Sequence, residues 1–292
     1  MNEKMLYVEL PKGARFQRVS VMDDGRIGIA YTDEADIPKN DIVENNFIPK
    51  PEPLVGGGEV YRKEGSLYWY CKVKMNDVFM HFYTRDLTED DLMYDLKGKK
   101  RNFKTSKQKS FRDNVLEALA NKPQKGFCWI SAYEPSLDAV DGLKIVENKA
   151  PFTGWGCETW KKSIMDYLPR NESKMCSKTT YFLLLLRWLK DGIATFEEIV
   201  VDSSEIGHYS NTTGASDYGK ERTGKREFGG VYGLIGNTIK IVEDELSKTG
   251  FSRVGGSYIN EGKLWPAAQT KPVKSDNNHC SQFGVGIIEL QK

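Results

Sequence analysis

The sequence lacks the cysteine and histidine patterns that mark metal-bound and disulfide-linked proteins. Its 292 residues include five cysteines, an odd number, and only three histidines. The cysteines are widely spaced and form no Cys-x-x-Cys pair, which argues against a zinc site and a disulfide framework. We expect buried free thiols in a chain made in a reducing compartment. These cysteines are Cys71, Cys128, Cys157, Cys176 and Cys280.

An excess of charge and a long hydrophobic run are also missing. Lysine and arginine total 42 and aspartate and glutamate 41, a net charge of +1, so no global attraction to nucleic acid or to an anionic membrane is expected. The longest apolar run, residues 181–186, is far shorter than the roughly 18 residues of a membrane span. The first residues, MNEKMLYVELPKG, lack the apolar segment of a secretory signal. We expect no nucleic-acid partner and no membrane association.

The first hundred residues have the alternating pattern of short β-strands. Asp23-Asp24-Gly25 separates two alternating runs as in a β-hairpin. A second strand pair is predicted over residues 66–75 and 78–84. Residues 97–109 are rich in lysine and contain no acid. This stretch is interpreted as a solvated linker, with a patch that binds nucleic acid or an anionic surface as the alternative. The predicted domains are therefore a β-rich module, residues 1–100, and a second domain, residues 101–292.

The second domain mixes helices and strands. Residues 179–190 have the strongest helical pattern, with apolar side chains nearly all round, so this helix is expected to be buried. Further helices are predicted over residues 111–120 and 155–168, and residues 209–228 have the composition of a long surface loop. Towards the end, β-branched runs at 238–242 and 285–288 alternate with glycine-rich turns. The predicted fold class is α+β.

No familiar catalytic motif is present: the chain has no GxSxG, HExxH, P-loop or GxGxxG sequence. His81 lies on a predicted strand and is interpreted as structural, whereas His208 and His279 fall in polar loops that could meet. The acids at residues 243–245 could bind Ca²⁺, but an exposed turn is favoured. We expect no catalysis, no metal and no cofactor.

A series of short motifs follows in order along the second half of the chain. They are TTY opening the helix at 179, YSNTTG at 209–214, GVYGLIGN at 230–237, RVGGSY at 253–258, PAAQ at 266–269 and FGVG at 283–286. In this order they resemble the formylglycine-generating-enzyme (sulfatase-modifying-factor) superfamily, a branch of the C-type-lectin-like fold. The resemblance is closer to its non-catalytic members, found in phage tail-fibre and receptor-binding proteins and in retroelement-diversified variable proteins. It covers roughly residues 125–292.

The departures from that family concern its chemistry. The enzymes carry two cysteines after the Gly-Gly-Ser-Tyr turn, and the matching positions are Asn260 and Trp265. Cys280 stands alone, so the two sulfur ligands of a copper-thiolate site are missing. The family's Trp-Glu-Trp run is replaced by Ile239-Lys240-Ile241. The resemblance therefore implies binding rather than catalysis.

Binding members of the family display side chains from their last two loops. Tyrosine and tryptophan supply contact area there, and asparagine and serine supply adaptable hydrogen bonds. The alternatives are that Trp265 belongs to the core and that Asn277-Asn278 forms a turn. The implied ligand-binding residues are Tyr258, Asn260, Lys263 and Trp265 from one loop, and Ser275, Asp276, Asn277, Asn278 and His279 from the other.

The resemblance implies a function without catalysis. We expect a virion component of a phage (tail, fibre or head decoration) that binds a host-surface protein or glycan. The N-terminal module would attach it to other virion proteins, and a homo-oligomer is expected. Two alternatives stay open: a structural virion protein with no receptor role, and a divergent oxidase of the same superfamily.

Overall fold

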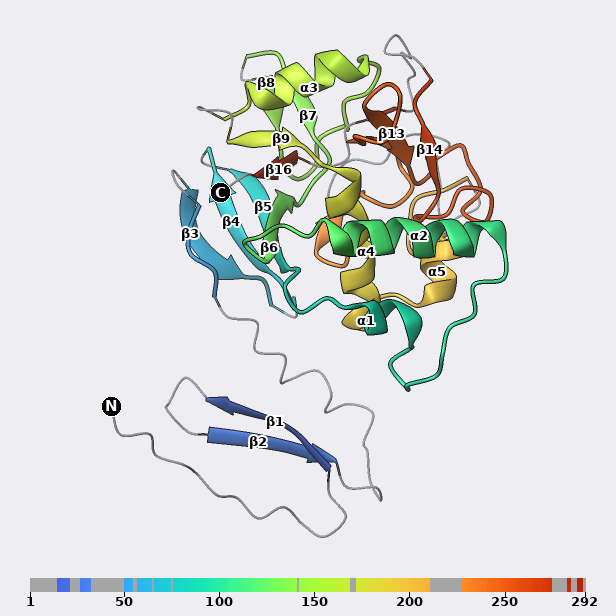
Figure 1. Cartoon of the computed structure of the whole chain (residues 1–292). Coiled ribbons are helices and arrows are strands. Elements are labelled where there is room, and N and C mark those ends of the chain that lie inside the picture. Colours follow the sequence, from blue (N-terminus) through green and yellow to red (C-terminus); the bar gives the residue numbers. More distant parts are fainter. Residues whose placement is uncertain are drawn as a thin grey trace. The chain divides into compact units, whose positions relative to one another are not determined.

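The computed structural model divides the chain into two compact units, Met1–Pro49 and Lys50–Lys292. In the first unit, β1 (Arg15–Val21) and β2 (Ile27–Thr32) form an antiparallel pair, which confirms the predicted hairpin. Figure 1 shows the elements of both units. The residues described are 15–21, 27–32, 50–54, 57–64, 66–74, 76–140, 142–168, 172–210, 227–274, 283–284 and 288–290.

The second unit is built on a six-stranded antiparallel sheet of order β3-β4-β5-β6-β16-β9. Its first three strands come from the segment that the sequence had assigned to the N-terminal module. The boundary predicted at residue 100 differs from the structure, because β5 pairs with β6 from Phe79↔Ser131 to Tyr83↔Phe127. The strands are β3 (Gly57–Arg62), β4 (Trp69–Val73), β5 (Asp77–Tyr83), β6 (Phe127–Ser131), β9 (Ser173–Met175) and β16 (Ile288–Leu290).

The lysine-rich stretch, residues 97–109, is not a linker, because helix α2 (Ser106–Ala120) begins inside it. Thr105 caps this helix. Its hydroxyl accepts a hydrogen bond from the backbone N–H of Gln108 (3.3 Å), and the Gln108 side chain accepts one from the N–H of Thr105 (3.0 Å). This reciprocal pair is a capping box. A short helix, α1 (Glu89–Met93), precedes it and begins with a similar box at Thr88.

Helix α4 (Lys178–Lys190) lies at the centre of the core, as its apolar pattern predicted. Ser177 caps it by accepting a hydrogen bond from the N–H of Thr180 (3.0 Å). Helix α2 packs beside α4 (Figure 1), and the indole of Trp188 donates a hydrogen bond to the carbonyl of Gly229 (3.0 Å). The predicted buried helix is confirmed. No helix among the described residues is long and apolar enough to cross a membrane.

Helices cover both faces of the main sheet. Thr180 of α4 donates a hydrogen bond to Glu289 (2.8 Å) on one face, while Phe79 and Tyr167 pack together on the other, beside α3. A second sheet has the order β14-β13-β12-β15, with β15 parallel to β12. The remaining elements are α3 (Cys157–Met165), α5 (Phe196–Val200), β7 (Ser136–Asp138), β8 (Gly142–Lys144), β10 (Glu227–Phe228), β11 (Val231–Tyr232), β12 (Ile239–Glu243), β13 (Phe251–Val254), β14 (Thr270–Pro272) and β15 (Phe283–Gly284).

The core contains four free cysteines, as expected: Cys71, Cys128, Cys157 and Cys176 are all buried. Burial raises the pKa of Cys128 and Cys176 above the usual thiol range. Both thiols are therefore protonated at neutral pH and are poor nucleophiles. Cys280 lies outside the described residues.

His81 is a fully buried histidine on β5, and neither of its ring nitrogens has a hydrogen-bond partner. The rings of Tyr83, Phe127 and Trp129 surround it, with centroids 4.6–4.9 Å away. Burial lowers the pKa of His81 from 6.5 to about 3. The imidazole is therefore neutral inside the sheet, in agreement with a structural role.

This burial makes the stability of the protein depend on pH. The unfolded chain binds a proton at His81 near pH 6.5 and the folded chain only near pH 3, so the contribution is complete above 6.5 and is lost as pH falls towards 3. From pH 7 to 4.5 the wild type should lose about 2–3 kcal/mol that a His81→Phe variant keeps. Urea unfolding of both proteins at the two pH values measures this difference. An equal loss of unfolding free energy in the two proteins would mean that the surrounding rings stabilise an imidazolium.

Candidate functional site

The glycine-rich turn of residues 230–237 is fixed by close backbone packing. Gly236 has φ +69°, and a β-carbon there would lie 2.3 Å from the carbonyl oxygen of His208. On either side of it, the N–H of His208 donates to Ile235 (3.1 Å) and the N–H of Asn237 donates to His208 (2.7 Å). Only glycine fits this contact. His208 is thereby buried in the turn, and His279, its suggested partner, lies outside the described residues.

A buried ion pair also contacts the turn of residues 230–237. The ammonium of Lys240 contacts the carboxylate of Glu134, and the two side chains are 1% and 2% exposed. Lys240 also donates to the carbonyls of Gly233 (3.1 Å) and Gly236 (3.2 Å). Burial lowers the pKa of Lys240, and the charge of Glu134 opposes that shift. Through these contacts Lys240 anchors the turn.

The loop of residues 255–265 contains four of the predicted binding residues and is called the recognition loop for that prediction. It is anchored through Asn260. The side-chain oxygen of Asn260 accepts hydrogen bonds from the N–H and the hydroxyl of Ser257, both at 2.9 Å. Its backbone carbonyl accepts two more from Ser210, also at 2.9 Å. The N–H of Tyr258 donates to the carbonyl of Asn237 (3.1 Å). Asn260, predicted as a contact residue, thus uses its side-chain oxygen to shape the loop.

The other predicted residues of this loop keep exposed surface. Tyr258 and Trp265 are half-buried and Lys263 is exposed, so Trp265 is not a fully buried core residue. The Trp265 ring lies 5.3 Å from the guanidinium carbon of Arg253 and 4.3 Å from the ammonium of Lys271. These two cations come from β13 and β14, which pair in register at these positions. The loop surface is therefore aromatic and basic.

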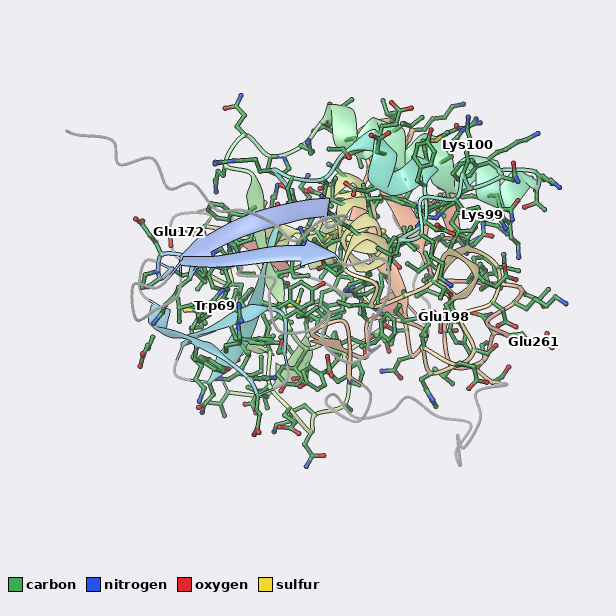
Figure 2. The ribbon with its side chains drawn as sticks, turned by 90° about the horizontal axis from the view of Figure 1, so that it is seen from below. Trp69, Lys99, Lys100, Glu172, Glu198 and Glu261 are labelled. Carbon is green, nitrogen blue, oxygen red and sulfur yellow. The ribbon has the colours of Figure 1, made fainter. Side chains whose placement is uncertain are left out.

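Lys107 of α2 joins the recognition loop to the helical side of the fold. Its ammonium donates a hydrogen bond to the carbonyl of Lys263 (2.6 Å). Burial lowers the pKa of Lys107, the charge of Asp202 opposes this shift, and the charges of Lys263 and Lys271 add to it. In Figure 2 the labelled side chains of Lys99 and Lys100 lie toward the same side of the view as Glu261. No local pattern in the sequence predicts the contact between Lys107 and Lys263, because these two residues are far apart along the chain.

The second predicted loop cannot be placed. Ser275, Asp276, Asn277, Asn278 and His279 lie outside the described residues, as do residues 211–226 of the predicted surface loop. Of the nine predicted binding residues, the structure brings together Tyr258, Asn260, Lys263 and Trp265. It adds Arg253, Lys271 and Lys107, which sequence reasoning missed.

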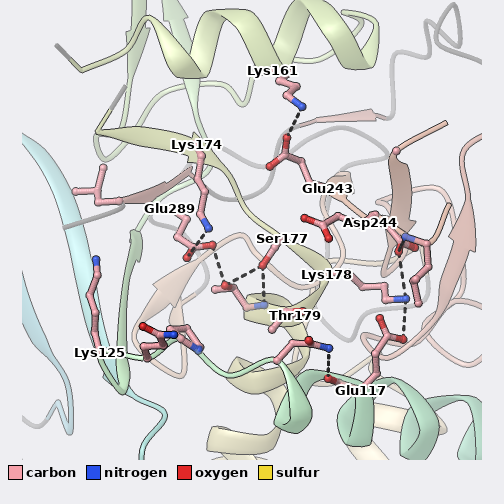
Figure 3. A pocket seen from close by; sticks show the side chains of 18 of the residues that line it. Glu117, Lys125, Lys161, Lys174, Ser177, Lys178, Thr179, Glu243, Asp244 and Glu289 are labelled. Atoms are coloured by element: carbon pink, nitrogen blue, oxygen red, sulfur yellow. Dashed lines mark hydrogen bonds and ion pairs between the residues drawn. The ribbon is translucent and has the colours of Figure 1, made fainter. Parts of the chain in front are cut away.

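A separate groove of about 910 Å³ opens at the N-terminal end of α4 (Figure 3). Two of the lysines that line it form ion pairs: Lys161 with Glu243 (2.9 Å) and Lys174 with Glu289 (3.3 Å). The sequence analysis did not predict this groove. Its charged lining residues are Glu117, Lys125, Lys161, Lys174, Lys178, Glu243, Asp244, Glu245 and Glu289.

The hydroxyl groups of Ser177 and Thr180, which line this groove, take part in the hydrogen bonds at the N-terminus of helix α4. Ser177 donates to Thr180 (3.0 Å), and Thr180 donates to the buried carboxylate of Glu289 (2.8 Å). This chain of hydrogen bonds contains no histidine or free amine that could act as a general base for either hydroxyl. We therefore interpret the groove as a polar, salt-bridged surface.

The acidic run at residues 243–245 borders the groove and is largely engaged by lysines. Besides the Glu243 pair, Asp244 lies 3.4 Å from Lys178 and accepts a hydrogen bond from Ser252 (2.6 Å). Asp244 is buried, which differs from the exposed turn predicted there. Within the part of the chain that the structure describes, no group of three or more His, Cys, Asp or Glu residues is placed to hold a metal ion.

The described residues form an α+β protein whose two larger sheets have six and four strands. Comparison with protein families, with curated proteins and with solved structures found no match to this chain.

Proposed function

We propose that this chain is a non-catalytic recognition protein that binds its ligand through the recognition loop. The observation that carries this proposal is that the residues which fix the backbone of the loop differ from those whose side chains are exposed. Its backbone is held by Asn260 and Ser210, whereas Tyr258, Lys263 and Trp265 keep exposed surface. A rigid backbone lowers the entropy lost on binding, and aromatic side chains supply contact area.

The proposed fold of residues 50–292 is C-type-lectin-like. Two features support it: the late strand β16 inserts into the main sheet, and the second sheet carries the recognition loop between β13 and β14. The glycine-rich motifs that carry the resemblance lie in or beside the turns of that second sheet. Asn260 and Trp265, at the positions of the family's cysteines, support a binding role over an oxidase.

The proposed setting is a phage virion, as a tail, fibre or head-decoration component. The ligand is a host-surface protein or glycan, and the aromatic and basic character of the loop suits stacking on a sugar ring or contact with an acidic surface. In this proposal the first unit, residues 1–49, attaches the protein to other virion proteins, and the assembled form is a homo-oligomer.

Trp265→Ala should weaken binding of the full chain to its host ligand at least tenfold. The indole supplies much of the exposed aromatic area of the loop, and central aromatic residues dominate binding energies. A glycan array and a host-cell binding assay identify the ligand, and titration of both proteins then gives the affinities.

Val140→Ala is the control, because Val140 is 90% exposed and lies between β7 and β8, outside the recognition loop. It should bind as the wild type does. Equal binding by Trp265→Ala would assign recognition to another surface. A wild-type chain that binds no host ligand but assembles into particles would favour the structural role.

A further inference from the structure

Lys63 reaches from the loop after β3 into a cluster of four tyrosines. Its ammonium lies 4.4 Å from the ring centroid of Tyr232 and 4.6 Å from that of Tyr70. The ring of Tyr133 is 5.4 Å away, and the ammonium donates hydrogen bonds to the hydroxyls of Tyr232 (3.0 Å) and Tyr133 (3.5 Å). Tyr61 stacks on Tyr70 from outside. We call these four rings the tyrosine cage.

The walls of the tyrosine cage are held without help from Lys63. Tyr133 and Tyr232 stack with centroids 4.6 Å apart, and the N–H of Tyr232 donates to the carbonyl of Ala132 (2.7 Å). Tyr61 and Tyr70 are register partners on β3 and β4. The hydroxyl of Tyr70 donates to the carbonyl of Gly230 (3.2 Å). Backbone pairing therefore preorganises the cage.

The electrostatics of the cage favour a cation. Burial raises the pKa of Tyr70 and Tyr133, so both phenols stay neutral and present the negative faces of their rings. Burial lowers the pKa of Lys63. Two exposed carboxylates, Glu227 and Glu147, add negative charge nearby and oppose this shift without reversing it. The cage thus attracts positive charge but makes an ammonium give up part of its hydration.

A quaternary ammonium group matches this environment better than a lysine does. It is permanently charged and weakly hydrated, so it loses less on entering, and aromatic cages are a known means of binding such groups. We propose that the tyrosine cage is a binding site for a quaternary ammonium group, with Lys63 as a resident cation that the ligand displaces. The cage lies on β3, β4, β11 and the segment after β6, and none of its residues belongs to the recognition loop. The inference is thus independent of the proposed function.

The test is isothermal titration of choline into the wild-type chain and into Lys63→Ala. Removing the competing cation should tighten choline binding at least tenfold. In Lys63→Ala, the neutral isostere 3,3-dimethyl-1-butanol should bind roughly tenfold more weakly than choline, because it lacks the charge that the rings attract. Free trimethyl-lysine, titrated in parallel, distinguishes a methylated amino acid from a choline head group as the source of the cation.

Two matched variants locate the site. Adding Tyr232→Leu to Lys63→Ala should abolish most choline binding, and Lys72→Ala, which removes an exposed lysine of the neighbouring strand, should bind as the wild type does. Lys63→Gln removes the charge but keeps a polar side chain one atom shorter than lysine, and it replaces Lys63→Ala if that variant unfolds at a much lower temperature. No saturable binding by a folded Lys63 variant, or equal binding of choline and its neutral isostere, would overturn the proposal.

Discussion

Glu134→Leu should lower the free energy of unfolding by about 3–5 kcal/mol, the usual cost of breaking a buried ion pair. Lys240 is only 1% exposed, and without Glu134 its charge has no compensating partner inside the protein. Asn237 and Thr238 also donate hydrogen bonds to this carboxylate and would lose their acceptor. Urea unfolding followed by circular dichroism at neutral pH measures the loss.

Two further variants test whether this loss of stability comes from the buried Glu134–Lys240 ion pair itself. Lys161→Met breaks an ion pair with Glu243 whose side chains are 41% and 24% exposed, and it should cost less than about 1 kcal/mol. The double variant Glu134→Leu, Lys240→Met removes both charges and should recover much of the single variant's loss. A Glu134→Leu loss no larger than that of Lys161→Met would contradict the anchoring role of the pair.

Gly236→Ala should destabilise the protein by about 3 kcal/mol or more, because backbone strain and a backbone clash act together. The added β-carbon would lie 2.3 Å from the carbonyl oxygen of His208, and neither segment can move without breaking the hydrogen bonds that join them. Thermal and urea unfolding give the change.

Gly250→Ala is a closely matched control. Gly250 has φ +76°, near the +69° of Gly236, but nothing lies within 4 Å of the added carbon. Its cost should be about 1 kcal/mol, the strain of a left-handed conformation alone. If both variants lost the same stability, the contact with His208 would not be the reason for glycine at 236.

The local parts of this fold could be predicted from the sequence. Helix α4 was recognised because its apolar side chains recur at helical spacing and Ser177 stands at its start. The β1–β2 pair was recognised because Asp23-Asp24-Gly25 separates two alternating runs. Such signals depend on neighbouring residues, which the sequence displays directly.

The domain boundary was wrong because it depended on pairing between distant segments. The lysine-rich composition of residues 97–109 indicates a linker, but the same stretch contains a local signal for a helix start, the capping box of Thr105 and Gln108. Nothing in the alternating pattern of residues 77–83 could reveal β6 as the next strand, more than forty residues later. Charge composition is therefore a weak indicator of a linker when a capping box interrupts it.

The side chains of the candidate sites also come together from segments far apart in the sequence, which local patterns do not predict. The recognition loop was predicted from a resemblance, but Arg253, Lys271 and Lys107 surround it through tertiary contacts alone. The Glu134–Lys240 pair joins residues 106 positions apart. The tyrosine cage gathers side chains from four segments of the chain. Only Tyr232 falls in a motif, GVYGLIGN, and that motif gives no sign of the other three tyrosines.

The position of β16 has a consequence for how the protein is made. Residues 288–290 pair with β6 on one side and β9 on the other, in the interior of the main sheet. Residues 288–290 follow every other strand of that sheet in the sequence, so β6 and β9 each keep an unpaired edge until these residues have been synthesised. Unpaired edges are sites of aggregation. We therefore expect the chain to be most prone to aggregation in the interval before β16 pairs with both strands.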